Sequence, residues 1–209
     1  TDTSGAYSFT GVAPGSYSAT IVTPLGYQTS TPTRTVGGCG ADANAGAFEV
    51  SCVPITAQPR AMGYWKHQVN AHLTGKGQAQ ETLDAMVSYI ALLVQHFNEN
   101  IVNPVIVYVP GASNSNDKLL QLQQLLTVNK GATSLDRAKQ HLLSLLLNVV
   151  SGKISQTQVV SDNGVTVSQA ITYANDLMTD GIAGNDDVAR NVCERINDGQ
   201  PIPSGLVPA

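Results

Sequence analysis

The stretch TSLDRAKQHLLSLLLNVV, residues 133–150, predicts a helix that is buried on most of its sides. Thr133 or Ser134 can cap its start, and Asp136 in the first turn suits the positive end of the helix dipole. The three consecutive leucines Leu145–Leu147 point in different directions, because an α-helix completes a turn in about 3.6 residues. We therefore expect this helix to lie inside a helical domain.

Residues 81–102, upstream of this stretch, predict an amphipathic helix. Their apolar side chains recur at spacings of three and four, which places them on one stripe. The members of the stripe are Leu83, Met86, Val87, Ile90, Val94, Phe97 and Ile101. Residues 118–128 predict a further helix, and the short apolar run at 103–110 ends in a polar loop.

Two more helices are expected downstream. Thr166 and Gln169 have the spacing of a capping box, and the helix that they begin ends at Gly181. A last helix is expected over residues 185–199, with an Asn or Asp as its cap. The prolines of the tail, residues 200–209, favour an extended conformation.

The first part of the chain predicts β-structure. Residues 6–12 (AYSFTGV) and 15–22 (GSYSATIV) alternate apolar and hydroxyl side chains, which is the period of a half-buried strand. The APG tripeptide supplies a turn between them, and Pro24 ends the second strand because it cannot donate to a ladder. The segments RTVGG and AFEVSCV suggest two further strands, and PITAQP, residues 54–59, is read as a linker.

Composition limits the classes of function. The 209 residues are 42% hydrophobic, which is enough for a core, and only 12% are charged. A net charge of −4 argues against a nucleic-acid surface, and no apolar run reaches the roughly 18 residues of a membrane span. Because the chain begins with Thr1 and shows no signal peptide, it reads as a processed or truncated product.

The cysteines and the N-terminal composition favour an oxidising, extracellular compartment. Residues 1–59 hold sixteen Ser or Thr but a single cation, Arg34. Cys39 and Cys52 bracket a short loop, and a disulfide between them would stabilise it by roughly 3 kcal/mol. Cys193 is expected to be a buried thiol. The alternative is three free thiols in a reducing cell.

The N-terminal residues resemble the B-type domains of bacterial surface proteins, from the serine–aspartate repeat and collagen-adhesin families. The matching positions are Asp2, Gly5, Tyr7, Phe9, Gly15, Tyr17, Pro24, Gly26 and Tyr27. The resemblance implies a prealbumin-like β-sandwich that serves as a stalk or spacer. Many such domains carry a Lys–Asn isopeptide cross-link, but Ile21 stands where the helping acid would be and no lysine precedes Lys66. The resemblance is therefore to the type without a cross-link.

The segment MGYWKHQVNAH, residues 62–72, resembles the Gly-Tyr-Trp-Lys-x-His motif that opens a helical region in many secreted bacterial proteins. Gln68 stands where that motif has its histidine, and His67 comes one place earlier. Residues 146–154 (LLNVVSGKI) resemble a second part of the same family, for which no activity is established. The resemblance implies an extracellular protein.

The expected fold class is α+β in two domains. Residues 1–54 would form a partial antiparallel β-sandwich, prealbumin-like, whose upstream strands are missing. Residues 55–60 would be a linker, and residues 61–209 an all-α helical bundle with an extended C-terminal tail.

The GYWKH segment is also a candidate ligand site. Exposed Tyr64 and Trp65 could stack on a sugar, with Lys66 or His67 bonding to its hydroxyl groups. Alternatively, Trp65 could anchor the start of the helical domain against its core, which is the commoner role of a lone aromatic residue at such a place.

Metal sites are weakly indicated. The histidines, His67, His72, His96 and His141, lack the spacing of a zinc site. Oxygen-bearing side chains gather in residues 161–164 and 180–187, and calcium ligands there would be Asp180, Asn185, Asp186 and Asp187. Neither stretch follows the twelve-residue calcium loop, and turn or cap roles explain both. No cofactor is expected beyond this calcium candidate.

The function expected from the sequence is that of a non-enzymatic, extracellular structural protein of a bacterial surface layer, stalk or fibre. No nucleophile elbow, phosphate loop or dinucleotide fingerprint is present. A neighbouring copy, or another part of this chain, would complete the sheet by β-strand addition along an edge that carries Tyr7, Phe9, Tyr17 and Ile21. The rival explanation of the missing strands is truncation of the chain. The alternatives are a carbohydrate-binding or adhesive module that holds polysaccharide, and a cell-envelope hydrolase.

Overall fold

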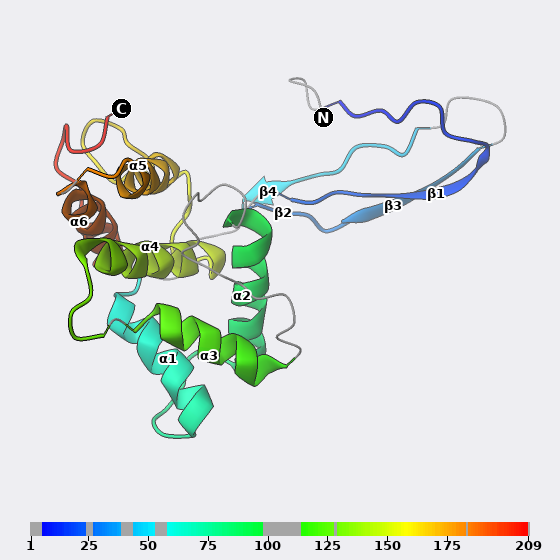
Figure 1. Cartoon of the computed structure of the whole chain (residues 1–209). Coiled ribbons are helices and arrows are strands. Elements are labelled where there is room, and N and C mark those ends of the chain that lie inside the picture. Colours follow the sequence, from blue (N-terminus) through cyan, green and yellow to red (C-terminus); the bar gives the residue numbers. More distant parts are fainter. Residues whose placement is uncertain are drawn as a thin grey trace. The chain divides into compact units, whose positions relative to one another are not determined.

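The computed structural model of this chain describes residues 6–23, 27–38, 44–52, 58–97, 114–127, 129–182 and 184–208. The chain divides into two compact units, Thr1–Val53 and Pro54–Ala209. Over the described residues, the strands lie in the first unit and the helices in the second (Figure 1). No helix among these residues has the length and apolarity needed to cross a membrane.

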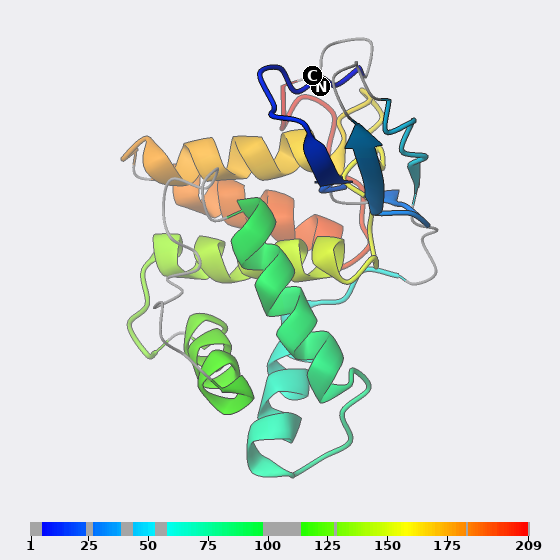
Figure 2. The ribbon, with the colours of Figure 1, turned by 90° about the vertical axis from the view of Figure 1, so that its right-hand side faces the viewer.

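The second unit, called here the helical unit, is built from helices that fall into two groups around one central helix. Their bounds are α1 Met62–Thr74, α2 Leu83–Phe97, α3 Ser115–Leu125, α4 Ser134–Val150, α5 Val167–Thr179 and α6 Asn185–Asn197. Helices α4, α5 and α6 pack together, and α1, α2 and α3 form the other group (Figures 1 and 2). Helix α4 contacts members of both groups, so it holds the unit together.

The sequence of α4 explains its central position. Every residue from Leu142 to Val150 is buried, which confirms the burial expected from Leu145–Leu147. Thr133 is its N-cap and forms a reciprocal capping box with Asp136. Thr166 and Gln169 form the capping box predicted for α5. The N-cap of α6 is Gly184 rather than an Asn or Asp side chain.

The C-terminal tail packs against the unit, and it is extended around Ile202 but turns after Pro203, where the Leu206 N–H donates to the Pro203 carbonyl at 3.2 Å. The Ile202 N–H donates to the Val160 carbonyl at 2.7 Å, and Ile202 forms a parallel bridge with Ser161. Ile202 and Val207 are both buried. The side chains of this tail therefore contribute to the core.

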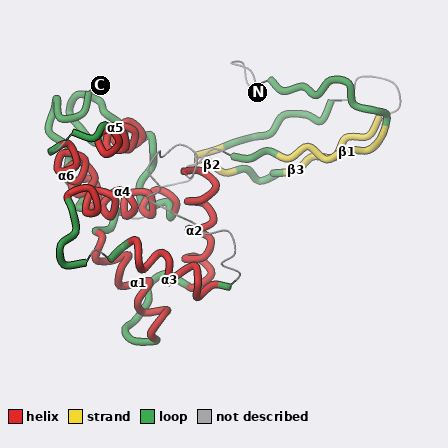
Figure 3. The backbone as a smooth tube through the Cα atoms, in the orientation of Figure 1, coloured by secondary structure: helices red, strands yellow, loops and turns green. Residues whose placement is uncertain are grey.

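The N-terminal unit contains two short antiparallel pairs among its described residues. Strand β1, Gly15–Thr20, pairs with β3, Thr33–Gly38; β2, Tyr27–Gln28, pairs with β4, Ser51–Cys52 (Figure 3). In the longer pair, Gly15 lies opposite Gly38 and Thr20 opposite Thr33.

The expected prealbumin-like β-sandwich is therefore wrong, and the described structure is mostly helical. A sandwich needs two sheets whose inner faces bury alternating side chains. Residues 6–12 alternate as a strand would, but none of the described strands includes them, and Phe9 is 76% exposed. Alternation reports only an extended backbone, and none of the described side chains of this unit is buried between two sheets.

The predicted disulfide cannot be placed, because Cys39 lies outside the described residues and only the backbone of Cys52 in β4 is described. Asp2, Gly5, Pro24 and Gly26, four positions of the resemblance, also lie outside them, as do Ile101 and the run at 103–110. Cys193 on α6 is a buried free thiol, as predicted, and burial raises its pKa to about 12.

Candidate functional site

The two signature stretches of the helical unit, residues 62–72 and 146–154, meet in space. Trp65 on α1 is fully buried, and its indole N–H donates to Oδ1 of Asn148 on α4 at 3.2 Å. Asn148 is also completely buried. A contact between positions 83 residues apart in the sequence thus joins the start of this unit to its central helix.

Asn148 uses all of its hydrogen-bonding capacity. Its Oδ1 also accepts from the Arg60 N–H at 2.9 Å, while Nδ2 donates to the Arg60 carbonyl and to Oδ1 of Asn197, each at 2.9 Å. Asn197 in turn donates to the His141 carbonyl. A fully satisfied buried amide specifies one arrangement of its neighbours, because an unpaired polar group would be costly there.

The end of α4 positions the next part of the site. Gly152 has φ of 70°, a left-handed conformation that favours glycine. Its N–H donates to the Val149 carbonyl at 3.0 Å, and the Lys153 N–H donates to the Asn148 carbonyl at 2.9 Å. This is a Schellman motif, which ends the helix and turns the chain at Lys153.

Lys153 forms a buried ion pair with Glu81, which lies just before α2. Its Nζ is 2.7 Å from Glu81 Oε1, and both side chains are only 11% exposed. Tyr64 donates to Oε1 at 2.6 Å and Tyr89 donates to Oε2 at 3.0 Å. Lys153 Nζ also lies 5.6 Å from the ring centroid of Trp65. We call Tyr64, Trp65, Glu81, Tyr89 and Lys153 the Glu81 cluster.

The electrostatics of the Glu81 cluster keep the carboxylate charged and the phenols neutral. Burial alone would raise the pKa of Glu81, but the hydrogen bonds and charge of Lys153 and the two tyrosine hydroxyls outweigh it and lower that pKa. Burial, the Glu81 charge and the hydrogen bond to it raise the pKa of Tyr89 to about 12. The pKa of Tyr64 is raised by burial and by the same carboxylate.

Gln68 and His72 hold the loop that carries Glu81. The buried Gln68 Oε1 accepts the backbone N–H groups of Gln80 at 2.6 Å and of Glu81 at 3.0 Å. The His72 ring donates from Nε2 to the Glu81 carbonyl at 2.8 Å. Gln68, which replaces the histidine of the Gly-Tyr-Trp-Lys-x-His motif, thus positions the Glu81 carboxylate.

Partners within the chain hold the Glu81 carboxylate in its charged form. A general acid is expected to have a raised pKa, whereas the pKa of Glu81 is lowered because its hydrogen bonds and the Lys153 charge outweigh the effect of burial. Its two oxygens already accept from two hydroxyl groups and one ammonium. The cluster joins α1, the loop before α2, α2 and the turn after α4, so it cross-links the two helix groups.

The four residues proposed from the sequence to bind a ligand, at positions 64–67, differ in how far they are buried. Trp65 has the position of the anchor, and its edge-to-face neighbours are Tyr64 and Tyr89 at centroid distances of 5.1 and 6.1 Å. The half-buried Tyr64 ring has the Arg60 guanidinium 5.1 Å from its centroid. Lys66 and His67 are exposed on α1. The structure therefore does not combine these side chains into one open stacking surface.

The histidines have local roles or none that the structure describes. The His67 ring donates from Nε2 to the Gln78 carbonyl at 3.1 Å. His141 Nδ1 is buried without a hydrogen-bond partner, and burial lowers the pKa of this histidine. His96 is half-buried near the end of α2. Within the described ranges, no three His, Cys, Asp or Glu side chains are grouped to hold a metal.

The calcium candidates make local contacts around the turn before α6 and in its first turn. Asp180 accepts the Ile182 N–H at 2.8 Å through Oδ1 and the Asn185 amide at 2.6 Å through Oδ2. Asp187 pairs with Arg190 one turn along α6 at 3.3 Å. Burial, with the charges of Asp180 and Asp187, raises the pKa of Asp186. In residues 161–164, the Ser161 hydroxyl accepts the Val165 N–H at 2.9 Å.

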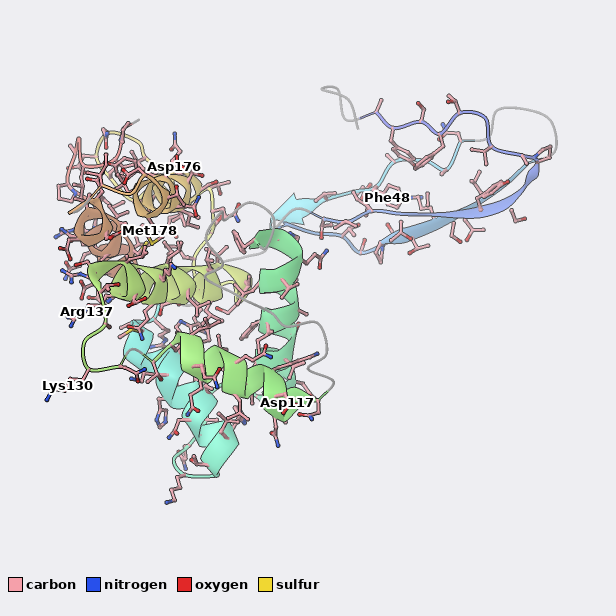
Figure 4. The ribbon with its side chains drawn as sticks, viewed as in Figure 1. Phe48, Asp117, Lys130, Arg137, Asp176 and Met178 are labelled. Carbon is pink, nitrogen blue, oxygen red and sulfur yellow. The ribbon has the colours of Figure 1, made fainter. Side chains whose placement is uncertain are left out.

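The residues of the predicted association edge lie in the N-terminal unit. Phe9 and Tyr17 are exposed, and Tyr7 donates to the Gly46 carbonyl at 2.7 Å. The Tyr7 ring packs against Phe48, at a centroid distance of 5.7 Å (Figure 4). The Ile21 N–H continues the β1–β3 ladder by donating to the Pro32 carbonyl at 2.9 Å.

Sequence reasoning missed Glu81, Tyr89, Asn148 and Lys153. A signal for one of them was present: Asn148 is an amide within an otherwise apolar run of a buried helix, where it needs partners.

Comparison with known protein families, with curated proteins and with solved structures finds no match to this chain.

Proposed function

We propose that this chain is a non-enzymatic structural protein of a bacterial extracellular layer, stalk or fibre, whose copies associate through the N-terminal unit. One observation carries the proposal: no described side chain of that unit is buried. A two-stranded pair is marginally stable in water when nothing covers it. Association would supply the cover that the unit lacks.

The exposed apolar side chains of the N-terminal unit support this proposal. They are Phe9, Val12, Tyr17, Val22 and Val50. Burying a side chain such as valine or phenylalanine completely is worth roughly 1.5–3 kcal/mol. Contact with another polypeptide would therefore stabilise both the pair and the assembly.

The helical unit supports the non-enzymatic part of the proposal. Glu81 and Lys153 pair with each other, and Asn148 bonds to Trp65 and Asn197. These polar groups therefore contact other residues of the unit rather than facing a substrate. The extracellular part rests on the low charge and the Ser/Thr-rich composition of residues 1–59.

The test is the size of the purified chain as a function of concentration. Light scattering and electron microscopy should show particles that grow with concentration from the 21.9 kDa monomer. A monodisperse monomer over the whole accessible range, with protected amides throughout the N-terminal unit, would contradict the proposal.

A further inference from the structure

The β1–β3 pair has two outer edges whose free backbone groups can be assigned. The bond from Ile21 N–H to the Pro32 carbonyl sets the alternation of the antiparallel ladder, in which every second residue points its N–H and C=O away from the partner strand. The outward residues of β1 are thus Ser16, Ser18 and Thr20. Those of β3 are Thr33, Thr35 and Gly37.

These two edges match each other in length and charge. Each strand has six residues, which corresponds to an edge of roughly 20 Å. None of the outward residues is charged, and the charged residues among the described part of this unit are Arg34 and Glu49. Arg34 already lies 5.6 Å from the centroid of the Phe48 ring. Two copies can meet along these edges without like charges in contact.

The two edges differ in their surroundings. A hollow of about 1230 Å³ is lined by residues 6–14, by β1 and by residues 44–47, while β3 contributes only Val36 to it. The hollow is larger than the roughly 300–1,000 Å³ of small-molecule sites, so an extended polypeptide fits its size better.

We propose that β3 of a second copy adds to the outer edge of β1 within this hollow. A second β1 fits less well, because each β1 carries its own segment 6–14 along the hollow. Since the donor edge and the acceptor edge are different surfaces, the contact repeats head to tail from copy to copy, and it gives a fibre when the rotation between copies does not close into a ring. This inference rests on the proposed self-association and adds the partner strand and the polarity.

The experiment uses the full chain with a proline at one outward position in each strand. Ser18→Pro removes a free N–H of β1 and Thr35→Pro removes one of β3, and proline is tolerated where the N–H faces away from the ladder. Ser18→Ala and Thr35→Ala keep the N–H groups and serve as matched controls. Mass is measured by light scattering at one concentration at which the unmodified chain forms particles.

Each proline variant alone should remain a monomer, and both alanine variants should form particles like the unmodified chain. An equimolar mixture of the two proline variants should give dimers and nothing larger, since the Ser18→Pro chain keeps the β3 edge and the Thr35→Pro chain keeps the β1 edge. Dimer formation also shows that each variant retains a folded edge.

Other results would overturn the inference. Loss of assembly in Ser18→Pro while Thr35→Pro still forms particles would indicate pairing of two β1 strands. A mixture of the two proline variants without dimers would exclude the β3–β1 contact. Particles from both proline variants would exclude these edges while leaving the proposed self-association in place. A monomeric unmodified chain, including one whose β1 is protected only by a different protein, would contradict both.

Discussion

In α4 every residue from Leu142 to Val150 is buried, whereas in β1 every residue from Gly15 to Thr20 is exposed or half-buried. Asn148 of α4 finds all four of its hydrogen-bond partners within the chain. The second element has one strand partner and no core. The difference teaches that the helical unit is stabilised by contacts within the chain, while the N-terminal unit leaves its side chains and strand edges open to another polypeptide.

The largest effect is expected from Asn148→Ala. The substitution leaves the buried Trp65 N–H and the Arg60 backbone groups without partners, and such groups cost roughly 1–3 kcal/mol each. We expect the free energy of unfolding to fall by about 4 kcal/mol in total. Urea denaturation measures this, with Asn191→Ala on the exposed side of α6 as the control. A loss no greater than that of the control would contradict internal stabilisation.

A smaller loss is expected from Lys153→Met. It leaves the Glu81 carboxylate buried without its cation, and breaking a buried ion pair costs roughly 3 kcal/mol. Adding Glu81→Gln should restore part of the loss, because the unpaired charge is then removed. Lys130→Met, at an exposed lysine (Figure 4), is the matched control and should be neutral. Additive effects in the double variant would argue against the pairing.

A pH dependence of stability should follow from Tyr89. Its folded pKa is about 12 against an ordinary value of 10.0, so its contribution is complete below pH 10 and is lost as the pH rises through 12. Glu81 acts in the other direction: its lowered pKa gives stability above its ordinary value of 4.5 that is lost as the pH falls. Urea midpoints between pH 9 and about 12 should fall less steeply in Tyr89→Phe. If the urea midpoint falls equally steeply with pH in Tyr89→Phe and in the control Tyr173→Phe, Tyr89 does not cause the pH dependence of stability.

The smallest effect on folding is expected from Phe9→Ser in the N-terminal unit. Because Phe9 is 76% exposed, the free energy of unfolding of the helical unit should change by less than about 0.5 kcal/mol. The same substitution should reduce the mass of particles seen by light scattering. A large loss of helical stability with unchanged particle mass would reverse the comparison between the two units.

The parts of the fold that the sequence predicts are those set by nearby residues. The Thr133 cap, the Thr166–Gln169 capping box and the burial of Leu145–Leu147 each depend on a few consecutive positions. The sandwich was wrong because the alternation around Tyr7 and Phe9 indicates an extended chain but names no partner strand.

The candidate site was harder to predict for a similar reason. Trp65 could be identified as a notable residue, but its partner Asn148 lies 83 positions away. The ion pair of Glu81 and Lys153 likewise joins residues whose meeting depends on how α4 packs. Spacing along the sequence reports such contacts only when they lie within one element.

Hydrogen–deuterium exchange of the full chain at increasing concentration tests the comparison most directly. The account predicts that amides of α4 are protected at every concentration, because their unit is complete in one chain. Amides of β1 and β3 should exchange freely in dilute solution and become protected as particles form. Equal protection of β1 and α4 in the dilute monomer would contradict the claim that the N-terminal unit is completed by association.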